Sequence, residues 1–103
     1  MILAIDIGNT NIVVGCIDEK KTIFIERLST IKNKMEIEYA LDIKVIFEIH
    51  GVEVRELEGA IISSVVPQIT GLVKDACEKI INKKAMVVGP GIKTGLNLSL
   101  IHI

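Results

Sequence analysis

Aromatic residues are nearly absent from this sequence. Its 103 residues include one tyrosine, two phenylalanines and no tryptophan, although half of all residues are hydrophobic. A hydrophobic core has to be filled with the residues that are available, so we expect a core built from isoleucine, valine and leucine. The length allows one domain at most.

The sequence also lacks a charge imbalance and a long hydrophobic run. Twelve basic and thirteen acidic residues leave a formal net charge of −1, without a basic block. This balance argues against nucleic acid as the main partner. No apolar stretch is long enough to cross a bilayer, and the first one is interrupted by Asp6 and preceded by no cationic segment. We therefore expect a cytoplasmic protein without a membrane partner.

Cysteine is scarce as well. The two cysteines, Cys16 and Cys77, lie far apart, one in a predicted strand and one in a predicted helix. Isolated cysteines in an aliphatic background are typical of buried thiols rather than of a disulfide or a metal site.

The most informative stretch is residues 5–11, with the sequence Ile-Asp-Ile-Gly-Asn-Thr-Asn. Apolar runs rich in β-branched residues flank it, which predicts two strands joined by a turn. Gly8 and Asn9 favour the turn, because both tolerate backbone conformations that other residues resist. The predicted unit is a hairpin with the carboxylate of Asp6 at the end of its first strand.

The predicted turn has the chemistry of an anion-binding loop. Its backbone N–H groups, two side-chain amides and one hydroxyl would lie beside the carboxylate of Asp6. Such donors suit a phosphate, and a carboxylate oxygen suits a Mg²⁺ ion that accompanies it. The alternative is an ordinary hairpin in which Asp6 and Asn9 satisfy the amides of the turn.

Five strands and two helices are predicted, in the order β-β-β-α-β-α-β. The strands cover residues 1–7, 11–18, 22–29, 59–65 and 85–88, and the helices cover residues 34–50 and 67–82. A three-stranded meander that feeds two crossover helices gives a mixed sheet, antiparallel on one side and parallel on the other. The fold class is therefore α/β.

The helix predicted at 34–50 carries apolar residues at i, i+4 spacing. The residues of this stripe, which we expect to face the core, are Ile37, Leu41, Val45 and Ile49, and the stripe is widened by Ile43, Ile46 and Phe47. Asn33 is placed to cap the start of the helix, and Gly51 is placed to end it. His50 is expected to cap the end of the helix or to face solvent.

Three segments resemble one protein family. The sequence Asp6-Ile7-Gly8-Asn9-Thr10 resembles the first phosphate loop of the acetate kinase, sugar kinase, Hsp70 and actin superfamily, and its Asn-Thr version resembles the type III pantothenate kinases. Residues 62–67 and 87–96 are similar to later stretches of the same family, in the same order and at compatible spacing. The resemblance covers residues 1–97 and implies a ribonuclease H-like half-domain. In that superfamily two such halves close over ATP.

The resemblance also implies a site. The residues implied to bind the phosphates of ATP are Asp6, Ile7, Gly8, Asn9, Thr10, Asn11, Ile12 and Val13. Asp6 would in addition hold Mg²⁺ through water, and Gly89, Gly91 and Gly95 would line the substrate cleft. The family also uses a monovalent cation, K⁺ or NH₄⁺, and is active as a homodimer.

The sequence departs from the family pattern after residue 97. The family continues into a Gly-Ala-Asp-Arg signature, whose aspartate is the general base, and into a second half-domain with another phosphate loop and the adenosine pocket. Neither is present in these 103 residues. Residues 98–103 resemble the translation of a sequencing adapter, so we expect a non-native tail there. A genuine apolar strand is the alternative.

The function that the resemblance implies is that of the N-terminal part of a pantothenate kinase. The full protein would use ATP to phosphorylate pantothenate at its primary hydroxyl, the first step toward coenzyme A. The chain alone is expected to be inactive, since the base and the second half-domain are missing. Two alternatives stay open: another kinase of the superfamily, and a non-enzymatic accessory or regulatory homologue.

Overall fold

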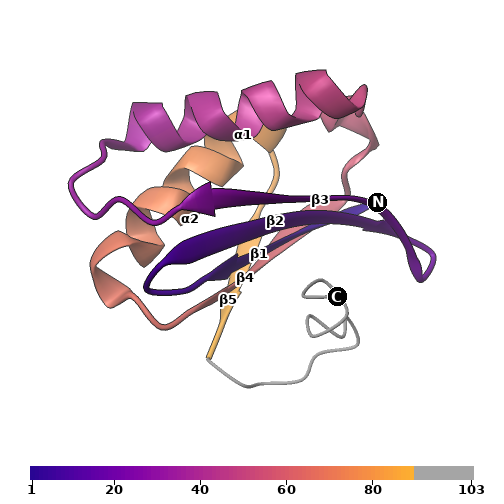
Figure 1. Cartoon of the computed structure of the whole chain (residues 1–103). Helices are drawn as coiled ribbons and strands as arrows, with labels where there is room; N and C mark the ends of the chain where they lie inside the picture. The colour runs from indigo at the N-terminus through magenta and orange to yellow at the C-terminus, as the bar shows by residue number, and fades with distance from the viewer. Residues whose placement is uncertain (90–103) are drawn as a thin grey trace.

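A computed structural model describes residues 1–89 of the chain. Figure 1 shows the elements, which are β1 (Ile2–Ile7), β2 (Asn11–Asp18), β3 (Lys21–Ser29), α1 (Glu36–His50), η1 (Val54–Glu56), β4 (Gly59–Ser64), α2 (Pro67–Ile81) and β5 (Ala85–Val88). The predicted element order is confirmed, and each predicted boundary lies within two residues of the observed one. The expected tail at 98–103 lies outside the described residues and stays a prediction.

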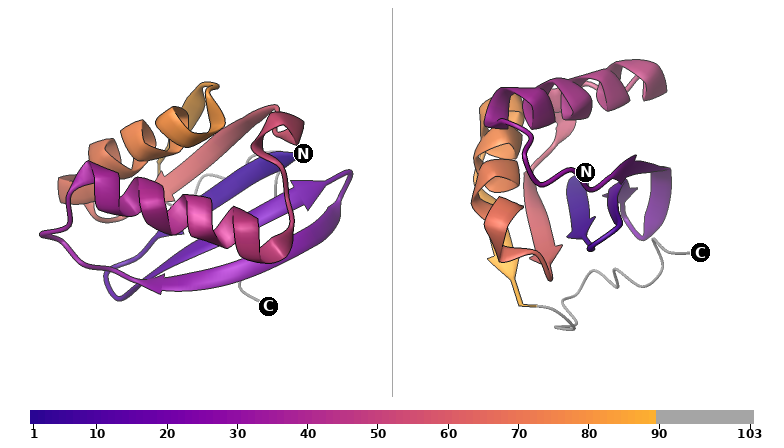
Figure 2. Two further views of the ribbon diagram at one scale, coloured as in Figure 1. Left: turned by 90° about the horizontal axis from the view of Figure 1, so that it is seen from above. Right: turned by 60° about the vertical axis from the view of Figure 1, so that its left-hand side comes forward.

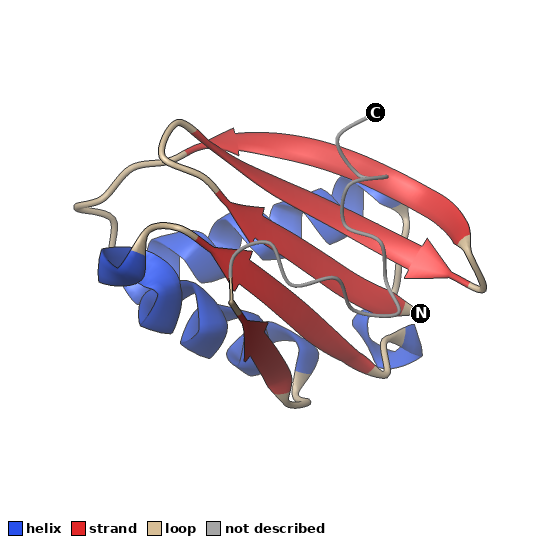
Figure 3. Cartoon of the chain, turned by 90° about the horizontal axis from the view of Figure 1, so that it is seen from below, coloured by secondary structure: helices blue, strands red, loops and turns tan. Residues whose placement is uncertain are grey.

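The five strands form one mixed sheet in the order β3-β2-β1-β4-β5. β1 pairs antiparallel with β2 and parallel with β4, and β4 pairs parallel with β5. The predicted division into an antiparallel and a parallel side is therefore confirmed. Because β1, β4 and β5 run in the same direction, their carboxyl ends meet at one edge of the sheet (Figure 3). The loop after β1 lies at this edge.

Both helices cover the same face of the sheet (Figure 2). The core lies between the helices and this face, and it is mainly aliphatic, as the composition predicts. Its fully buried members include Leu3, Ile5, Ile7, Ile62 and Ile69. Within residues 1–89, no helix lies on the opposite face, and none is long and apolar enough to cross a membrane.

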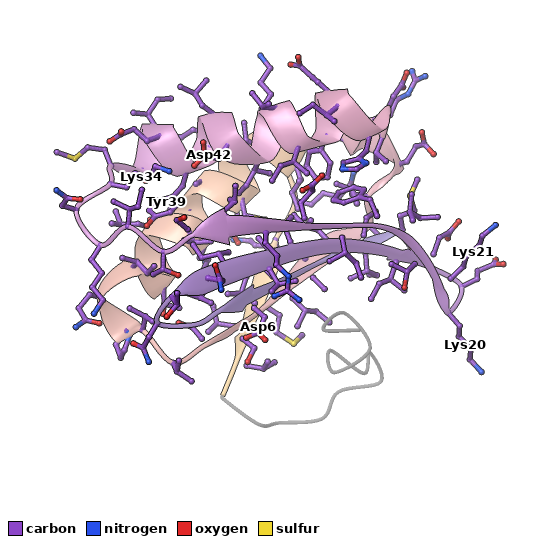
Figure 4. The ribbon with its side chains drawn as sticks, in the orientation of Figure 1. Asp6, Lys20, Lys21, Lys34, Tyr39 and Asp42 are labelled. Atoms are coloured by element: carbon purple, nitrogen blue, oxygen red, sulfur yellow. The ribbon has the colours of Figure 1, made fainter. Side chains whose placement is uncertain are left out.

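The buried stripe predicted for α1 is correct only in part. Ile43, Ile46 and Phe47, which widen the stripe, are buried as predicted. The four residues at i, i+4 spacing are exposed instead, with exposed fractions between 49% for Val45 and 71% for Ile49. The helix also buries Tyr39, which is 2% exposed. Since α1 carries apolar residues on both faces, spacing alone does not choose the buried one. The larger aromatic side chains fill the space above the sheet, and the Tyr39 hydroxyl donates a hydrogen bond to the carbonyl of Ile31 (Figure 4).

The start of α1 also differs from the prediction. The capping position is Met35 rather than Asn33. The backbone N–H of Met35 donates to a carboxylate oxygen of Glu38 at 2.9 Å. Glu38 therefore satisfies the N–H of the capping residue, as in a capping box. At the other end, Gly51 adopts φ = 68°, and the predicted glycine stop is confirmed.

His50 connects α1 to the sheet and does not only cap the end of the helix. Its Nε2 lies 2.7 Å from a carboxylate oxygen of Glu26 on β3. Its ring stacks on Phe24, with a centroid distance of 4.5 Å and an angle of 6° between the planes. His50 therefore has a structural role in joining the end of α1 to β3.

Both cysteines are buried free thiols, as predicted. Burial raises the pKa of Cys77 to about 12 and also raises the pKa of Cys16. A thiol with a raised pKa stays protonated in the folded chain. The stability that this contributes is lost as the pH rises above the pKa of the thiol in the unfolded chain, which is about 8.5.

At pH 8 we expect neither thiol to react with a disulfide reagent within minutes in the folded chain, and both to react in guanidinium. Rapid labelling of either thiol in the folded chain would contradict their burial.

Candidate phosphate-binding site

The loop between β1 and β2 is a tight turn at the edge of the sheet where the carboxyl ends of β1, β4 and β5 meet. β1 ends at Ile7 and β2 begins at Asn11, and the N–H of Gly8 donates to the carbonyl oxygen of Asn11 at 2.9 Å. Ile7 and Ile12, which flank the turn, are buried in the core and anchor both ends of it. Asn9, Thr10 and Asn11 are exposed. The structure thus holds the ends of the loop and leaves its tip open to solvent.

Gly8 is required for space rather than for an unusual backbone conformation. The residues of the described chain with positive φ are Glu19, Lys20, Gly51 and Asn82. Gly8 and Asn9 form the predicted turn without a positive φ. A Cβ atom on Gly8 would instead lie 3.1 Å from the carbonyl oxygen of Asn11, closer than ordinary contact.

Several hydrogen-bond donors of the loop remain available to a ligand. The backbone N–H groups of Asn9 and Thr10 donate to no other residue within 1–89. The side chains of Asn9, Thr10 and Asn11 likewise form no hydrogen bond inside that part of the chain. In an ordinary hairpin the Asn9 amide would satisfy the turn, which is not observed. The arrangement therefore favours the anion-binding interpretation.

Asp6 lies one residue before the loop, on the face of the sheet away from the helices. Its neighbours Ile5 and Ile7 are fully buried in the main core, and side chains alternate along a strand, so Asp6 points to the opposite face. Figure 4 shows Asp6 on the side of the sheet away from α1. In the register of the sheet, Asp6 stands between Val13 on β2 and Ser63 on β4. Asp6 is partly buried.

The chemistry of the site fits a Mg²⁺ ion brought by a phosphate. No group of three or more metal-ligating side chains exists among the described residues. A cage made only of protein groups is therefore not formed by residues 1–89. Mg²⁺ usually keeps several waters and binds through one or two carboxylates together with substrate phosphates. A single carboxylate, Asp6, next to a phosphate loop matches that pattern.

The end of β4 supports the loop from the neighbouring strand. The N–H of Val65 donates to the carbonyl of Ile7 at 3.0 Å, which extends the β1–β4 pairing to the start of the loop. Ser64 Oγ accepts hydrogen bonds from the N–H of Val66 at 3.0 Å and from the hydroxyl of Thr70 at 2.8 Å. The hydrogen bonds of Ser64 thus stabilise the turn that leads from β4 into α2. Pro67 occupies the first turn of α2, as predicted.

Sequence reasoning missed Thr30, the residue that follows β3. Its hydroxyl donates to the carbonyl of Gly8 at 2.7 Å, and its N–H donates to the carbonyl of Thr10 at 2.9 Å. The predicted meander could have indicated this contact between Thr30 and the loop. In an antiparallel meander the end of the third strand returns to the turn between the first two.

The expected substrate-cleft glycines are only partly placed. Gly89 directly follows β5, and Val88 pairs with Ser63, so Gly89 lies at the same edge as the loop. Gly91 and Gly95 lie outside the described residues. The cleft assignment for all three remains a prediction.

Comparison with known proteins decides the family. The family model for type III pantothenate kinases matches residues 2–102. The chain belongs to the type III pantothenate kinase family. Among curated type III pantothenate kinases, those of Bacillus cytotoxicus, Brevibacillus brevis and Halalkalibacterium halodurans are 45%, 44% and 41% identical to it over 98 residues.

These alignments cover 95% of this chain but only 37–39% of each of these type III pantothenate kinases. The chain thus spans about two fifths of the length of the curated relatives it matches. A hexokinase of the ROK type from Thermus thermophilus has a similar structure, with a TM-score of 0.63 and 16% sequence identity. This similarity covers 85% of the chain and 33% of the hexokinase. It supports the α/β fold.

Proposed function

We propose that this chain is the N-terminal half-domain of a longer protein that transfers the γ-phosphate of ATP to the primary hydroxyl of pantothenate. The observation that carries the proposal is a tight loop after Asp6 whose donors are unused, in a chain of the type III pantothenate kinase family. Pantothenate phosphorylation is the first step toward coenzyme A.

The loop residues would act by positioning the phosphates. The N–H groups of Asn9 and Thr10, with the amide and hydroxyl side chains around them, would bind β- and γ-phosphate oxygens. Asp6 would hold the water shell of Mg²⁺, which neutralises charge on the phosphates when it is bound. Phosphoryl transfer depends mainly on such positioning and on charge stabilisation. A loop held at both ends by buried strands is well suited to this task.

The rest of the machinery would come from outside residues 1–97. We propose that a Gly-Ala-Asp-Arg segment supplies the general base and that a second half-domain supplies the adenosine pocket. We also propose that the longer protein uses K⁺ or NH₄⁺, acts as a homodimer and works in the cytoplasm. The support for these points is membership of the family.

The experiment compares the isolated chain with the full-length protein, expressed from the complete reading frame that contains it. A coupled ADP-release assay is run with ATP, Mg²⁺ and pantothenate. We expect pantothenate-dependent turnover from the full-length protein and none above background from the isolated 103-residue chain.

Either of two outcomes would overturn the proposal. Turnover by the isolated chain would show that the missing half does not supply the chemistry. A full-length protein that lacks Gly-Ala-Asp downstream and shows no turnover would instead support a regulatory homologue. Thermal melts run alongside show that each protein is folded.

A further inference from the structure

Thr30, which directly follows β3, makes two hydrogen bonds to the phosphate loop although it is remote from the loop in sequence. Its hydroxyl donates to the Gly8 carbonyl at 2.7 Å, and its N–H donates to the Thr10 carbonyl at 2.9 Å. The two accepted carbonyls lie on either side of Asn9. One residue therefore fixes the loop at two points, and one of these contacts depends on a side chain.

Because the peptide unit is rigid, these two contacts also fix the directions of the N–H groups of Asn9 and Asn11. Each peptide unit is planar and trans, so its C=O and N–H point in opposite directions. The carbonyl of Gly8 belongs to the same unit as the N–H of Asn9, and the carbonyl of Thr10 to the same unit as the N–H of Asn11. When Thr30 holds these carbonyls, it also turns both N–H groups away from itself.

This orientation matters for anion binding. A phosphate is attracted by N–H groups and repelled by carbonyl oxygens, so a binding loop has to turn its carbonyls away from the ligand. The Asn9 N–H makes no other hydrogen bond within residues 1–89. We infer that Thr30 is a positioning residue, which orients the N–H group of Asn9 toward the phosphates of ATP. This inference rests on the proposed function.

The test uses the full-length protein with two substitutions at Thr30. Thr30→Val keeps the shape and the backbone N–H but removes the hydroxyl, whereas Thr30→Ser keeps the hydroxyl. Thr22→Val is the matched control, because Thr22 is exposed on β3 and its side chain forms no hydrogen bond within the described chain. ATP binding is measured by calorimetry, and the KM values for ATP and pantothenate are measured separately.

We expect Thr30→Val to weaken ATP binding and to raise the KM for ATP about three- to tenfold, as for the loss of one hydrogen bond. The KM for pantothenate should stay unchanged, and Thr30→Ser should restore ATP binding to within about twofold. Thr22→Val should behave as the unsubstituted protein in every measurement. A purely structural role would instead lower the melting temperature and change both KM values together.

Unchanged ATP binding by Thr30→Val would overturn the inference, as would a wild-type protein that binds no ATP. A loss that Thr30→Ser does not restore would also overturn it. If ATP binds with the expected pattern while pantothenate is not phosphorylated, the inference about Thr30 stands and the proposed function fails.

Discussion

Replacing Asp6 by asparagine in the full-length protein should lower kcat by about 10²–10³-fold, the usual effect of removing a group that stabilises charge in the transition state. The amide has nearly the same shape as the carboxylate, and Asp6 lies outside the main core. We therefore expect the free energy of unfolding to change by no more than about 0.5 kcal/mol. The substitution removes the negative charge that would hold the water shell of Mg²⁺. The Mg²⁺ concentration needed for half-maximal activity should therefore rise.

Asp42→Asn is the matched control for this change. Asp42 lies on α1, on the opposite side of the sheet, where its carboxylate forms an ion pair with Lys34 at 2.7 Å (Figure 4). The same carboxylate-to-amide exchange there should leave kcat and the Mg²⁺ dependence unchanged, with a loss of at most about 1 kcal/mol in stability. Steady-state kinetics across a Mg²⁺ series and thermal melts provide the measurements. Normal turnover by Asp6→Asn would remove Asp6 from the site.

Gly8→Ala should reduce kcat/KM for ATP by about 10–10²-fold, because small displacements of positioning groups are costly. The added Cβ would lie 3.1 Å from the Asn11 carbonyl oxygen. That oxygen belongs to the backbone and accepts the hydrogen bond that closes the turn, so it cannot move aside without shifting the loop. Gly8 has no positive φ, and alanine therefore meets no conformational penalty there. The loss should appear in ATP kinetics more strongly than in thermal stability.

Gly71→Ala provides the control for Gly8→Ala. Gly71 lies inside α2, and a Cβ atom there would meet nothing within 4 Å. Alanine favours helix over glycine, so this variant should gain about 0.5–1 kcal/mol in stability and keep its ATP kinetics. If Gly8→Ala also keeps wild-type ATP kinetics, close packing of the turn is not needed for phosphate binding.

Local signals explain why so much of the fold could be predicted. Runs of β-branched residues mark the strands, and the start of α2 and the end of α1 depend on single residues, Pro67 and Gly51. Each of these signals acts within a few residues of its own position. The order of the elements then allows only a mixed sheet, because a crossover helix makes the strands on either side of it parallel.

The buried face of α1 could not be predicted in the same way. The helix carries apolar residues on two faces, so the predicted stripe included both the exposed residues from Ile37 to Ile49 and the buried Ile43, Ile46 and Phe47. Which face is buried depends on the shape of the sheet below and on the hydrogen bond from Tyr39 to Ile31. Both are properties of the assembled fold rather than of the helix sequence.

The sequence by itself determined the chemistry of the loop, the identity of its flanking carboxylate and membership of the kinase family. Only the tertiary structure decided how the loop is held. It showed that Gly8 is needed for space and that Asp6 faces away from the helices. It also brought Thr30 to the Gly8 carbonyl across 22 positions of sequence. The physical reason is that turn and strand preferences act between neighbours in the chain, whereas the direction of a loop N–H depends on whatever the rest of the fold places against its carbonyls.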